Sequence, residues 1–474
     1  MTKQPSQSLQ GLAQATAVQL EALTPHRSLA ERYALGKRLR EKVPRKEHAV
    51  WKPPADRPDP VQLVLEGNQG RIPELLPLRH GRMVRSPFTF YRGAALHMAV
   101  DLATTPSTGV RVQCGGDAHL VNFRGFSTPE RRVIVALNDL DETLPAPWEW
   151  DVKRLAASFV VACRDNGLSA ATATEAVRTC AQTYRRRMAE FSAMQVLDLW
   201  YYALDADKLF PTIQDPAIRA RALARVEKER GRSVAEDLFP KLTGEKGGQP
   251  VIKDQHPLIY HPPYVKSLPK IKEVYAGYRE SLAPAHRVLL DRYEFKDAAL
   301  KVVGVGSVGT ACLVALLMAG DGDPLVLQVK EARASVLEPF AGKSVYPNHG
   351  ERVVNGLRLM QPASDIFLGW TQGASGRHYY VRQLRDVKII FAVETYRKAE
   401  MLLFAQLCGW SLALSHARSG DPAVISGYLG KSAAFDDALA TFAVAYADQT
   451  EKDHAALKAA VRTGKLKAFL EEPK

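Results

Sequence analysis

The spacing of apolar residues predicts helices toward both ends of the chain and short strands elsewhere. From 151 to 191, apolar residues recur at helical spacing on either side of a turn at 165–167, which predicts two long helices. The region 393–474 is helical in pattern and has a broad apolar face near its start. A further helix is predicted over 349–360. Short apolar runs predict strands at 111–114, 133–137, 325–330, 366–370 and 379–384.

These patterns divide the chain into five stretches and predict an α+β fold. In chain order we expect a polar helix followed by a basic, proline-rich arm, the first part of a helical region, a charged insertion on the acceptor side, a β-rich region and closing helices. Their boundaries are 1–60, 61–200, 201–295, 296–392 and 393–474.

The composition narrows the class of protein. With 474 residues, 46% of them hydrophobic, the chain can bury sizeable cores. No apolar run is long enough to span a membrane, and the first residues lack a signal-peptide pattern, so a cytoplasmic protein without a membrane span is expected. The five cysteines are scattered without paired spacing, which predicts neither disulfides nor a zinc site.

A formal net charge of +13 favours an anionic partner. A nucleotide, a nucleic acid and an acidic membrane surface all fit this charge. Nucleic acid is the less favoured class, because no aromatic residues interleave with the basic residues of the N-terminal arm. Arg85 and Arg92, which flank the segment SPFTFY, could clamp a phosphate or a carboxylate.

The candidate chemistry is concentrated in residues 114–142. The segment GDAHLVN places Asp117 and Asn122 five positions apart, and a strand-like run then leads to Asp139 and Asp141. Phosphoryl transfer uses a carboxylate to receive the proton of the attacking hydroxyl, and amide and carboxylate oxygens to hold Mg²⁺. We expect Asp117 in the first role, with Asn122, Asp139 and Asp141 as metal ligands. His119 is expected to brace the loop by hydrogen bonding.

A glycine motif, KVVGVGSVGT, has glycines at 304, 306 and 309 and follows an apolar run. In a Rossmann unit such glycines open a helix that binds pyrophosphate, and Glu331 could take the ribose of NAD(P), as in an oxidoreductase. In a kinase they form a hairpin flap over ATP, and the next strand carries a lysine. The run 311–319 is short for a Rossmann helix and ends in a hairpin-type turn, which favours the flap.

The flap interpretation assigns roles to nearby residues. Lys330 ends the predicted strand and is the candidate lysine for the phosphates of ATP, under the amides of Gly304, Gly306, Ser307 and Gly309. The predicted helix 349–360 would supply a carboxylate to orient Lys330. Glu351 is the first choice and Glu338 the second. At the start of the first long helix, Asp151 is expected to fix the loop that carries Asp117.

These segments resemble known families. GDAHLVN and NDLDE resemble the G-D-x-H-x-x-N catalytic loop and the I-D-F-E metal-binding segment of the aminoglycoside and choline phosphotransferases, a branch of the protein-kinase-like superfamily. Gly115 departs from that pattern, since these enzymes usually have a histidine there. Over nearly the whole chain, SPFTFYRGAA, CGGDAHLVNF, LNDLDETLPAPWEWDVKRLAAS, KVVGVGSVGT and LQVKEA are together similar to an uncharacterised bacterial family, domain of unknown function 2252.

The first resemblance implies an ATP- and Mg²⁺-dependent phosphotransferase that acts on a hydroxyl of a small-molecule acceptor. A nucleotide-binding pseudokinase and an AMP-transferring enzyme are the alternatives within the same superfamily. In ordinary kinases the glycine flap precedes the catalytic loop, whereas here Asp117 precedes Gly304. The expected fold is therefore a two-lobed, circularly permuted protein-kinase-like fold. An unpermuted interpretation would place the catalytic loop at 416–421, which lacks a matching asparagine.

Overall fold

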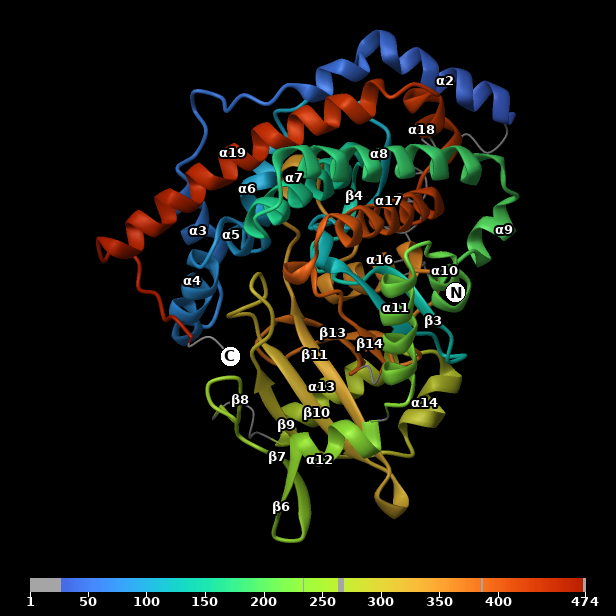
Figure 1. The fold of residues 1–474 in the computed structure, drawn as a ribbon. Coiled ribbons are helices and arrows are strands. Elements are labelled where there is room, and N and C mark those ends of the chain that lie inside the picture. The colour runs from blue at the N-terminus through green and yellow to red at the C-terminus, as the bar shows by residue number, and fades with distance from the viewer. Residues whose placement is uncertain (1–26, 233, 263–267, 385–386, 472–474) are drawn as a thin grey trace, which may run out of the picture.

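The structure, a computed structural model, describes residues 27–232, 234–262, 268–384 and 387–471. It is α+β, as expected, and has a helical part and a sheet part (Figure 1). The two long helices expected around the turn at 165–167 are confirmed as α7 and α8, and the helical C-terminal region is confirmed. The helix expected at the start of the arm lies outside the described residues.

The helical part contains α2 (Leu29–Lys42), α3 (Pro60–Asn68), α4 (Leu76–Val84), α5 (Pro87–Gly93), α6 (Ala95–Leu102), α7 (Trp148–Asp165), α8 (Ala170–Ala193), α17 (Lys398–Ser419), α18 (Pro422–Leu429) and α19 (Ala434–Arg462).

Both ends of the chain form this helical part. The helix α17 packs along α8, and α19 packs on α7 and α8, so that their apolar side chains share one core. The basic arm is also fastened to it. Arg40 and Arg45 donate hydrogen bonds to carbonyls at the end of α18, and Arg57 forms buried ion pairs with Asp101 (2.7 Å) and Asp453 (2.6 Å). Helix-end carbonyls lack partners within their own helix, and these arginines supply them.

A six-stranded antiparallel sheet forms the other part, in the order β12-β13-β11-β10-β9-β8. The expected helix at 349–360 is confirmed as α16, which packs against β11, β12 and β13. The expected strand 366–370 is shifted, because β12 begins three residues later, whereas the strands expected at 325–330 and 379–384 are confirmed. The elements are β8 (Ile259–Tyr260), β9 (Glu294–Lys301), β10 (Cys312–Met318), β11 (Pro324–Ala332), α15 (Glu338–Ala341), α16 (His349–Met360), β12 (Gly369–Gln372) and β13 (His378–Gln383).

The segment 201–295 covers this sheet on both faces. Leu317 and Leu325 pack with residues of α13 (Leu268–Glu280) and α14 (Pro284–Leu290), whereas Leu316 and Val326 pack on the opposite side, with the hairpin of β6 (Thr243–Lys246) and β7 (Gln249–Ile252) and with α12 (Phe239–Leu242). Strands buried on both faces read as continuous apolar runs, so β10 lacks the alternation that marks a half-exposed strand. The segment also forms α10 (Ala206–Leu209) and α11 (Pro216–Arg230), and α9 (Val196–Tyr201) lies at its start.

Two small antiparallel pairings bring the predicted polar loops together. The strand β1 (Arg111–Cys114) pairs with β4 (Leu144–Pro147), and β2 (Phe123–Ser127) pairs with β3 (Val133–Leu137). The second pair is extended by β14 (Lys388–Ile389) beside β2 and by β5 (Leu204–Asp205) beside β3. Cys114 lies opposite Leu144, and Phe123 lies opposite Leu137. The loops 115–122 and 138–143 are therefore held side by side at both of their ends. The strands expected at 111–114 and 133–137 are confirmed.

Arg352 on α16 joins the sheet part to the second of these loops. Its side chain is 1% exposed, and its guanidinium donates to the backbone carbonyls of Asp141 (2.8 Å), Arg333 (2.7 Å) and Thr143. A guanidinium has five N–H donors in a fixed planar arrangement, which allows one side chain to satisfy several carbonyls at once.

We expect Arg352→Met to lower the free energy of unfolding by about 2–4 kcal/mol, because it leaves buried carbonyl groups without donors. Arg358→Met is the matched control on the same helix. Arg358 is only partly buried, and among the described residues its side chain donates one hydrogen bond, to the carbonyl of Leu368 (2.9 Å), so we expect a loss below about 1 kcal/mol. Urea denaturation followed by circular dichroism measures both. Equal losses would contradict the role given to Arg352.

Candidate functional site

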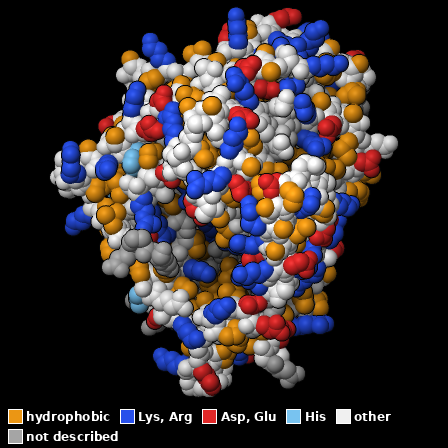
Figure 2. Space-filling model, in the orientation of Figure 1, with side chains coloured by type: hydrophobic (Ala, Val, Ile, Leu, Met, Phe, Trp, Pro, Cys, Tyr) orange, Lys and Arg blue, Asp and Glu red, His pale blue; other side chains and the backbone are white. Residues whose placement is uncertain are grey.

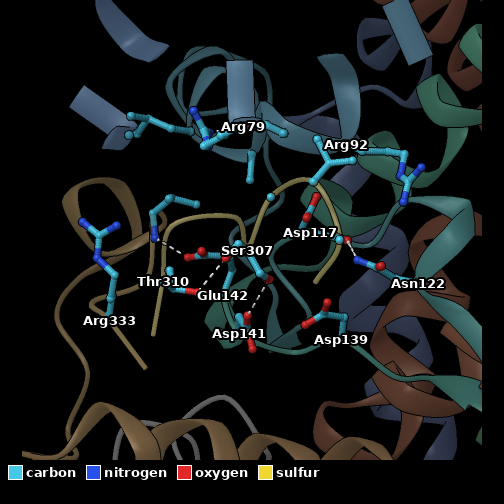
Figure 3. Close-up of a pocket in the computed structure, with 18 of the residues that line it drawn as sticks. Arg79, Arg92, Asp117, Asn122, Asp139, Asp141, Glu142, Ser307, Thr310 and Arg333 are labelled. Carbon is cyan, nitrogen blue, oxygen red and sulfur yellow. Dashed lines mark hydrogen bonds between the residues drawn. The ribbon is translucent and has the colours of Figure 1, made fainter. Parts of the chain in front are cut away.

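A cavity of 210 Å³ lies where the two polar loops meet the glycine loop (Figure 3). Most of the residues expected to carry the chemistry line it from both sides. From the polar loops and from the glycine loop these are Asp117, His119, Asn122, Asp139, Asp141, Gly304, Gly306 and Ser307. Gly309, Lys330 and Glu351 are not among the residues that line the cavity. In Figure 3, Asp117, Asn122 and Asp139 lie toward one end, Thr310 and Arg333 lie toward the other, and Ser307 and Asp141 lie between them.

Asp151 holds the first polar loop through its backbone. The carboxylate accepts hydrogen bonds from the amides of Gly115 (2.6 Å) and Gly116 (3.0 Å), as expected of a carboxylate that fixes this loop. Packing explains the departure of Gly115 from the phosphotransferase pattern, because a Cβ atom there would lie 2.5 Å from Leu137 Cδ2. Gly116 has a φ of +77°, a conformation that glycine adopts without strain.

Asp117 and Asn122 face the cavity from this loop. The carboxylate of Asp117 forms an ion pair with Arg154 on α7 (2.7 Å), and its backbone carbonyl accepts hydrogen bonds from Asn122 Nδ2 (2.8 Å) and from the amide of His119 (2.8 Å). Burial raises the pKa of Asp117 to about 7, although Arg154 opposes this shift. A carboxyl group that titrates near neutral pH can exchange a proton with a substrate.

His119 braces the loop with its backbone and not with its ring. Its amide donates to Asp117 and its carbonyl accepts from the amide of Asn122 (2.9 Å). The ring Nε2 lies 3.7 Å from the Asp117 carboxylate, which is beyond hydrogen-bond distance, and Nδ1 is buried without a hydrogen-bond partner among the described residues. Burial and the nearby Arg154 lower the pKa of His119 well below its usual value, which keeps the ring neutral.

Lys330 on β11 forms ion pairs with both acidic residues of the second polar loop. Its ammonium contacts the carboxylate of Asp141 and lies 3.4 Å from Asp139 Oδ1. Asp141 also accepts a hydrogen bond from Tyr380 Oη (2.8 Å). These two aspartates hold Lys330 in place of the glutamates that were expected to orient it. No hydrogen bond or ion pair joins Lys330 to Glu351 or Glu338 within the described part of the chain. The next residue of α16, Arg352, is the one that points to the acidic loop.

Burial and mutual charge set the ionisation of this group. Burial alone would raise the pKa of Asp139, but Lys330 together with Arg124 and Arg382 holds it well below its usual range. Burial and the neighbouring Asp139 raise the pKa of Asp141. Burial would lower the pKa of Lys330, yet the two carboxylates raise it well above the usual value. Lys330 is therefore charged at neutral pH, and Asp139 is ionised.

The glycine motif forms a loop between two antiparallel strands. It joins β9 to β10, and Gly304 and Gly309 have φ values of +66° and +89°. Arg71 and Arg82 hold its carbonyls: Arg71 donates to Gly306 and Val308 (both 2.7 Å), and Arg82 donates to Gly304 (2.6 Å). A hairpin flap agrees with this arrangement.

The local structure after the glycines does not fit the Rossmann interpretation of this motif. It requires a helix after the glycines, whereas that segment is the strand β10. Glu331, the candidate ribose ligand, accepts a hydrogen bond from the amide of Ala311 (2.8 Å) and lies 3.4 Å from Arg377. The unpermuted catalytic loop at 416–421 has another role as well, because Asp421 caps the N-terminus of α18 and does not line the cavity.

A buried cluster behind the loop contains Cys114, Asp151 and His416, with one ligand atom from each within 4.8 Å of the others. His416 Nε2 lies 3.3 Å from Asp151, and its Nδ1 is hydrogen-bonded to Tyr184 Oη (2.8 Å). Because the carboxylate also holds the two glycine amides, this cluster has a structural role in supporting the loop.

Sequence patterns did not identify several residues of the site. Arg154 lies one helical turn after Asp151, and that spacing places both on the same face of α7, which is a usable signal. Arg92 was a candidate from its place beside SPFTFY, but no motif marks the other arginines that line the cavity, because they come from elements far apart in the chain. They are Arg71, Arg79, Arg124 and Arg333.

Comparison with known proteins gives a family. A family model described as an uncharacterized protein conserved in bacteria (DUF2252) matches residues 71–460. The chain belongs to this family. No curated protein and no solved structure matches the chain. The match to the DUF2252 family begins at Arg71 and includes both polar loops, the glycine loop and Lys330. Among the helices of the described segments, none is both long and apolar enough to cross a membrane.

We expect Asp151→Asn to lower the free energy of unfolding by about 2–4 kcal/mol, because an amide oxygen replaces only one of the two carboxylate acceptors and the new NH₂ group faces a donor. Asp165→Asn makes the same chemical change at the exposed end of α7 and should cost less than about 0.5 kcal/mol. Chemical denaturation of both variants measures the difference. An unaffected Asp151→Asn protein would rule out the carboxylate as the anchor of the loop.

Proposed function

We propose that the protein transfers the γ-phosphoryl group of ATP, with Mg²⁺, to a hydroxyl of a small-molecule acceptor. The observation that carries the proposal is the convergence on one cavity of Asp117, Asn122, Asp139 and the glycine loop, with Lys330 paired to the acidic residues beside them. These residue types are the ones that phosphoryl transfer uses, and they come from segments far apart in the chain. The proposal includes a circularly permuted protein-kinase-like fold, in which the sheet part holds the nucleotide.

The donor set suits Mg²⁺, a hard cation that prefers oxygen ligands. Asn122 uses its Nδ2 within the loop, so Oδ1 is the atom that it offers to the cavity. Asp139 is kept ionised by the cations around it and is partly exposed. Asn122 and Asp139 would hold the ion, with Asp141 as a further ligand. When bound, Mg²⁺ would neutralise charge on the phosphate oxygens.

The remaining residues act on the substrates. In the transfer, the acceptor oxygen forms a bond to the γ-phosphorus while the bond from that phosphorus to the bridging oxygen breaks, and ADP leaves with the electron pair. Asp117 orients the acceptor hydroxyl and receives its proton. Lys330 supplies positive charge to the phosphates, and the amides of the glycine loop cover them.

Binding of ATP tests the proposal directly. We expect isothermal titration calorimetry to show Mg²⁺-dependent ATP binding by the wild type, at least about tenfold weaker in Lys330→Ala, because a charge-assisted contact is lost. Lys296→Ala is the control, since Lys296 lies on the same sheet outside the cavity and pairs with Glu294. Binding of NAD⁺ in place of ATP would contradict the proposal. Release of pyrophosphate instead of ADP would show transfer of AMP.

The pKa of Asp117 predicts how turnover depends on pH. A carboxyl group with a pKa of about 7 is protonated below that pH and cannot receive a proton, so we expect the rate of Mg²⁺-ATP turnover to rise with pH through about 7. The slow hydrolysis of ATP, with water as the acceptor, measures this by ADP release between pH 5.5 and 8.5, a range chosen to span roughly one and a half pH units on each side. A rate that falls over this range would exclude Asp117 as the base.

A further inference from the structure

The arginines that line the cavity lack carboxylate partners at ion-pair distance within the described part of the chain. Five arginines line it, and none forms an ion pair with a carboxylate of the described residues. Six carboxylates line the same cavity, and four of them pair with cations other than these five arginines: Asp117 pairs with Arg154, Asp139 and Asp141 pair with Lys330, and Glu331 pairs with Arg377. The other two are Glu66 and Glu142. Buried or half-buried cations without a counter-ion are costly, and this cost is relieved when an anion binds.

Three of these arginines already have structural partners. Arg71 holds the glycine loop, and Arg79 donates to Asn68 Oδ1 (2.8 Å) and to the carbonyl of Gly93 (3.0 Å). Arg333 donates to the carbonyl of Gln69 and lies at the end of the cavity away from Asp117 (Figure 3).

Arg92 and Arg124 make fewer side-chain hydrogen bonds than Arg71 and Arg79. The side chain of Arg92, on α5, has no hydrogen bond or ion pair to any described residue. Its Nε is buried without a partner, and its guanidinium lies 6.0 Å from the centre of the Phe88 ring. Arg124, on β2, makes one side-chain hydrogen bond, from Nε to the carbonyl of Val121 (3.2 Å). Most of the N–H donors of both guanidinium groups are therefore free for a ligand.

Both arginines line the cavity, and Arg124 lies two residues after Asn122, at the start of β2. Burial, followed by the charge of Arg124, lowers the pKa of Arg92, while Asp117 acts in the opposite direction. Figure 3 shows Arg92 on the same side of the cavity as Asp117 and Asn122, and Arg333 beyond Thr310. Two guanidinium groups with free donors in one cavity can together bind a phosphate or a carboxylate.

We propose that the acceptor is an anionic alcohol, whose phosphate or carboxylate group is bound by Arg92 and Arg124 so that its hydroxyl lies at Asp117. This rests on the proposed phosphotransferase function. The same charges would repel a cationic acceptor such as an amino sugar or a quaternary ammonium alcohol. Arg85, the other arginine that flanks SPFTFY, is exposed, donates to the carbonyl of Glu471 and does not line the cavity.

Thermal melting of the wild type with inorganic phosphate or acetate, against sodium chloride at equal ionic strength, tests the anion site. Each probe is used with the free protein and after saturation with Mg²⁺ and the non-hydrolysable ATP analogue AMP-PNP, which fills the nucleotide site. We expect one or both anions to raise the melting temperature of the free protein and of the protein saturated with Mg²⁺ and AMP-PNP. An effect of phosphate alone would indicate an acceptor that carries a phosphate group, and an effect of acetate alone would indicate one that carries a carboxylate. The apparent affinity should fall at least about tenfold in Arg92→Met and in Arg124→Met, and remain unchanged in Arg85→Met.

Arg92→Met without ligand should melt at the wild-type temperature or above, because no hydrogen bond is lost and a repulsion is removed. Equal anion binding by the wild type, Arg92→Met and Arg124→Met, or no anion binding by the wild type, would overturn the proposal. So would a loss of AMP-PNP affinity in Arg92→Met as large as the loss of anion affinity, because the arginine would then serve the nucleotide. Anion binding by a wild type that fails to bind Mg²⁺ and AMP-PNP would overturn the proposed function and leave the anion site intact.

Discussion

The buried ammonium group of Lys330 connects the two parts of the molecule. It lies on β11 in the sheet part and pairs with Asp139 and Asp141, which the helical part holds between β3 and β4. A buried ammonium without a counter-ion would cost several kcal/mol, and removing one partner of such a pair typically costs about 3–5 kcal/mol. The position of the sheet relative to the polar loops therefore depends on this contact. Arg352 and Tyr380 reinforce it by binding the same acidic loop from α16 and β13.

Local patterns predicted the elements well where turns or polar residues mark the ends of an element. The turn at 165–167 and the spacing of apolar residues were sufficient for α7 and α8, and the apolar run 133–137, bounded by polar residues, was sufficient for β3. The sequence could not decide β10 by periodicity, because both faces of that strand are buried. The choice of Glu351 over Arg352 shows a related limit. Adjacent residues of a helix point about 100° apart, so the residue that faces the acidic loop is decided by how α16 packs.

The arginines of the cavity were the least predictable feature. Arg92 was a candidate anion ligand from its neighbourhood in the sequence, but Arg71, Arg79, Arg124 and Arg333 follow no shared spacing and meet only after the chain has folded. Their common property is the absence of ion pairs with described carboxylates, which is visible only in three dimensions.

The order of the motifs along the chain is also understood only from the folded structure. The last helices return to pack on α7 and α8, so the site can be assembled although the polar loops precede the glycine loop in the chain. Figure 2 shows the surface of this molecule hollowed near the centre of one face, with Lys and Arg side chains around the hollow, in keeping with a formal net charge of +13.

We propose that the glycine loop, Lys330 and the two polar loops form one nucleotide site. A crystal structure of the protein with Mg²⁺ and AMP-PNP would show whether they do. We expect the triphosphate beneath residues 304–309, with Lys330 at its phosphates and with Asn122 and Asp139 as ligands of the metal ion. A nucleotide bound away from this cavity, or a triphosphate that contacts neither Lys330 nor Asp139, would contradict this proposal.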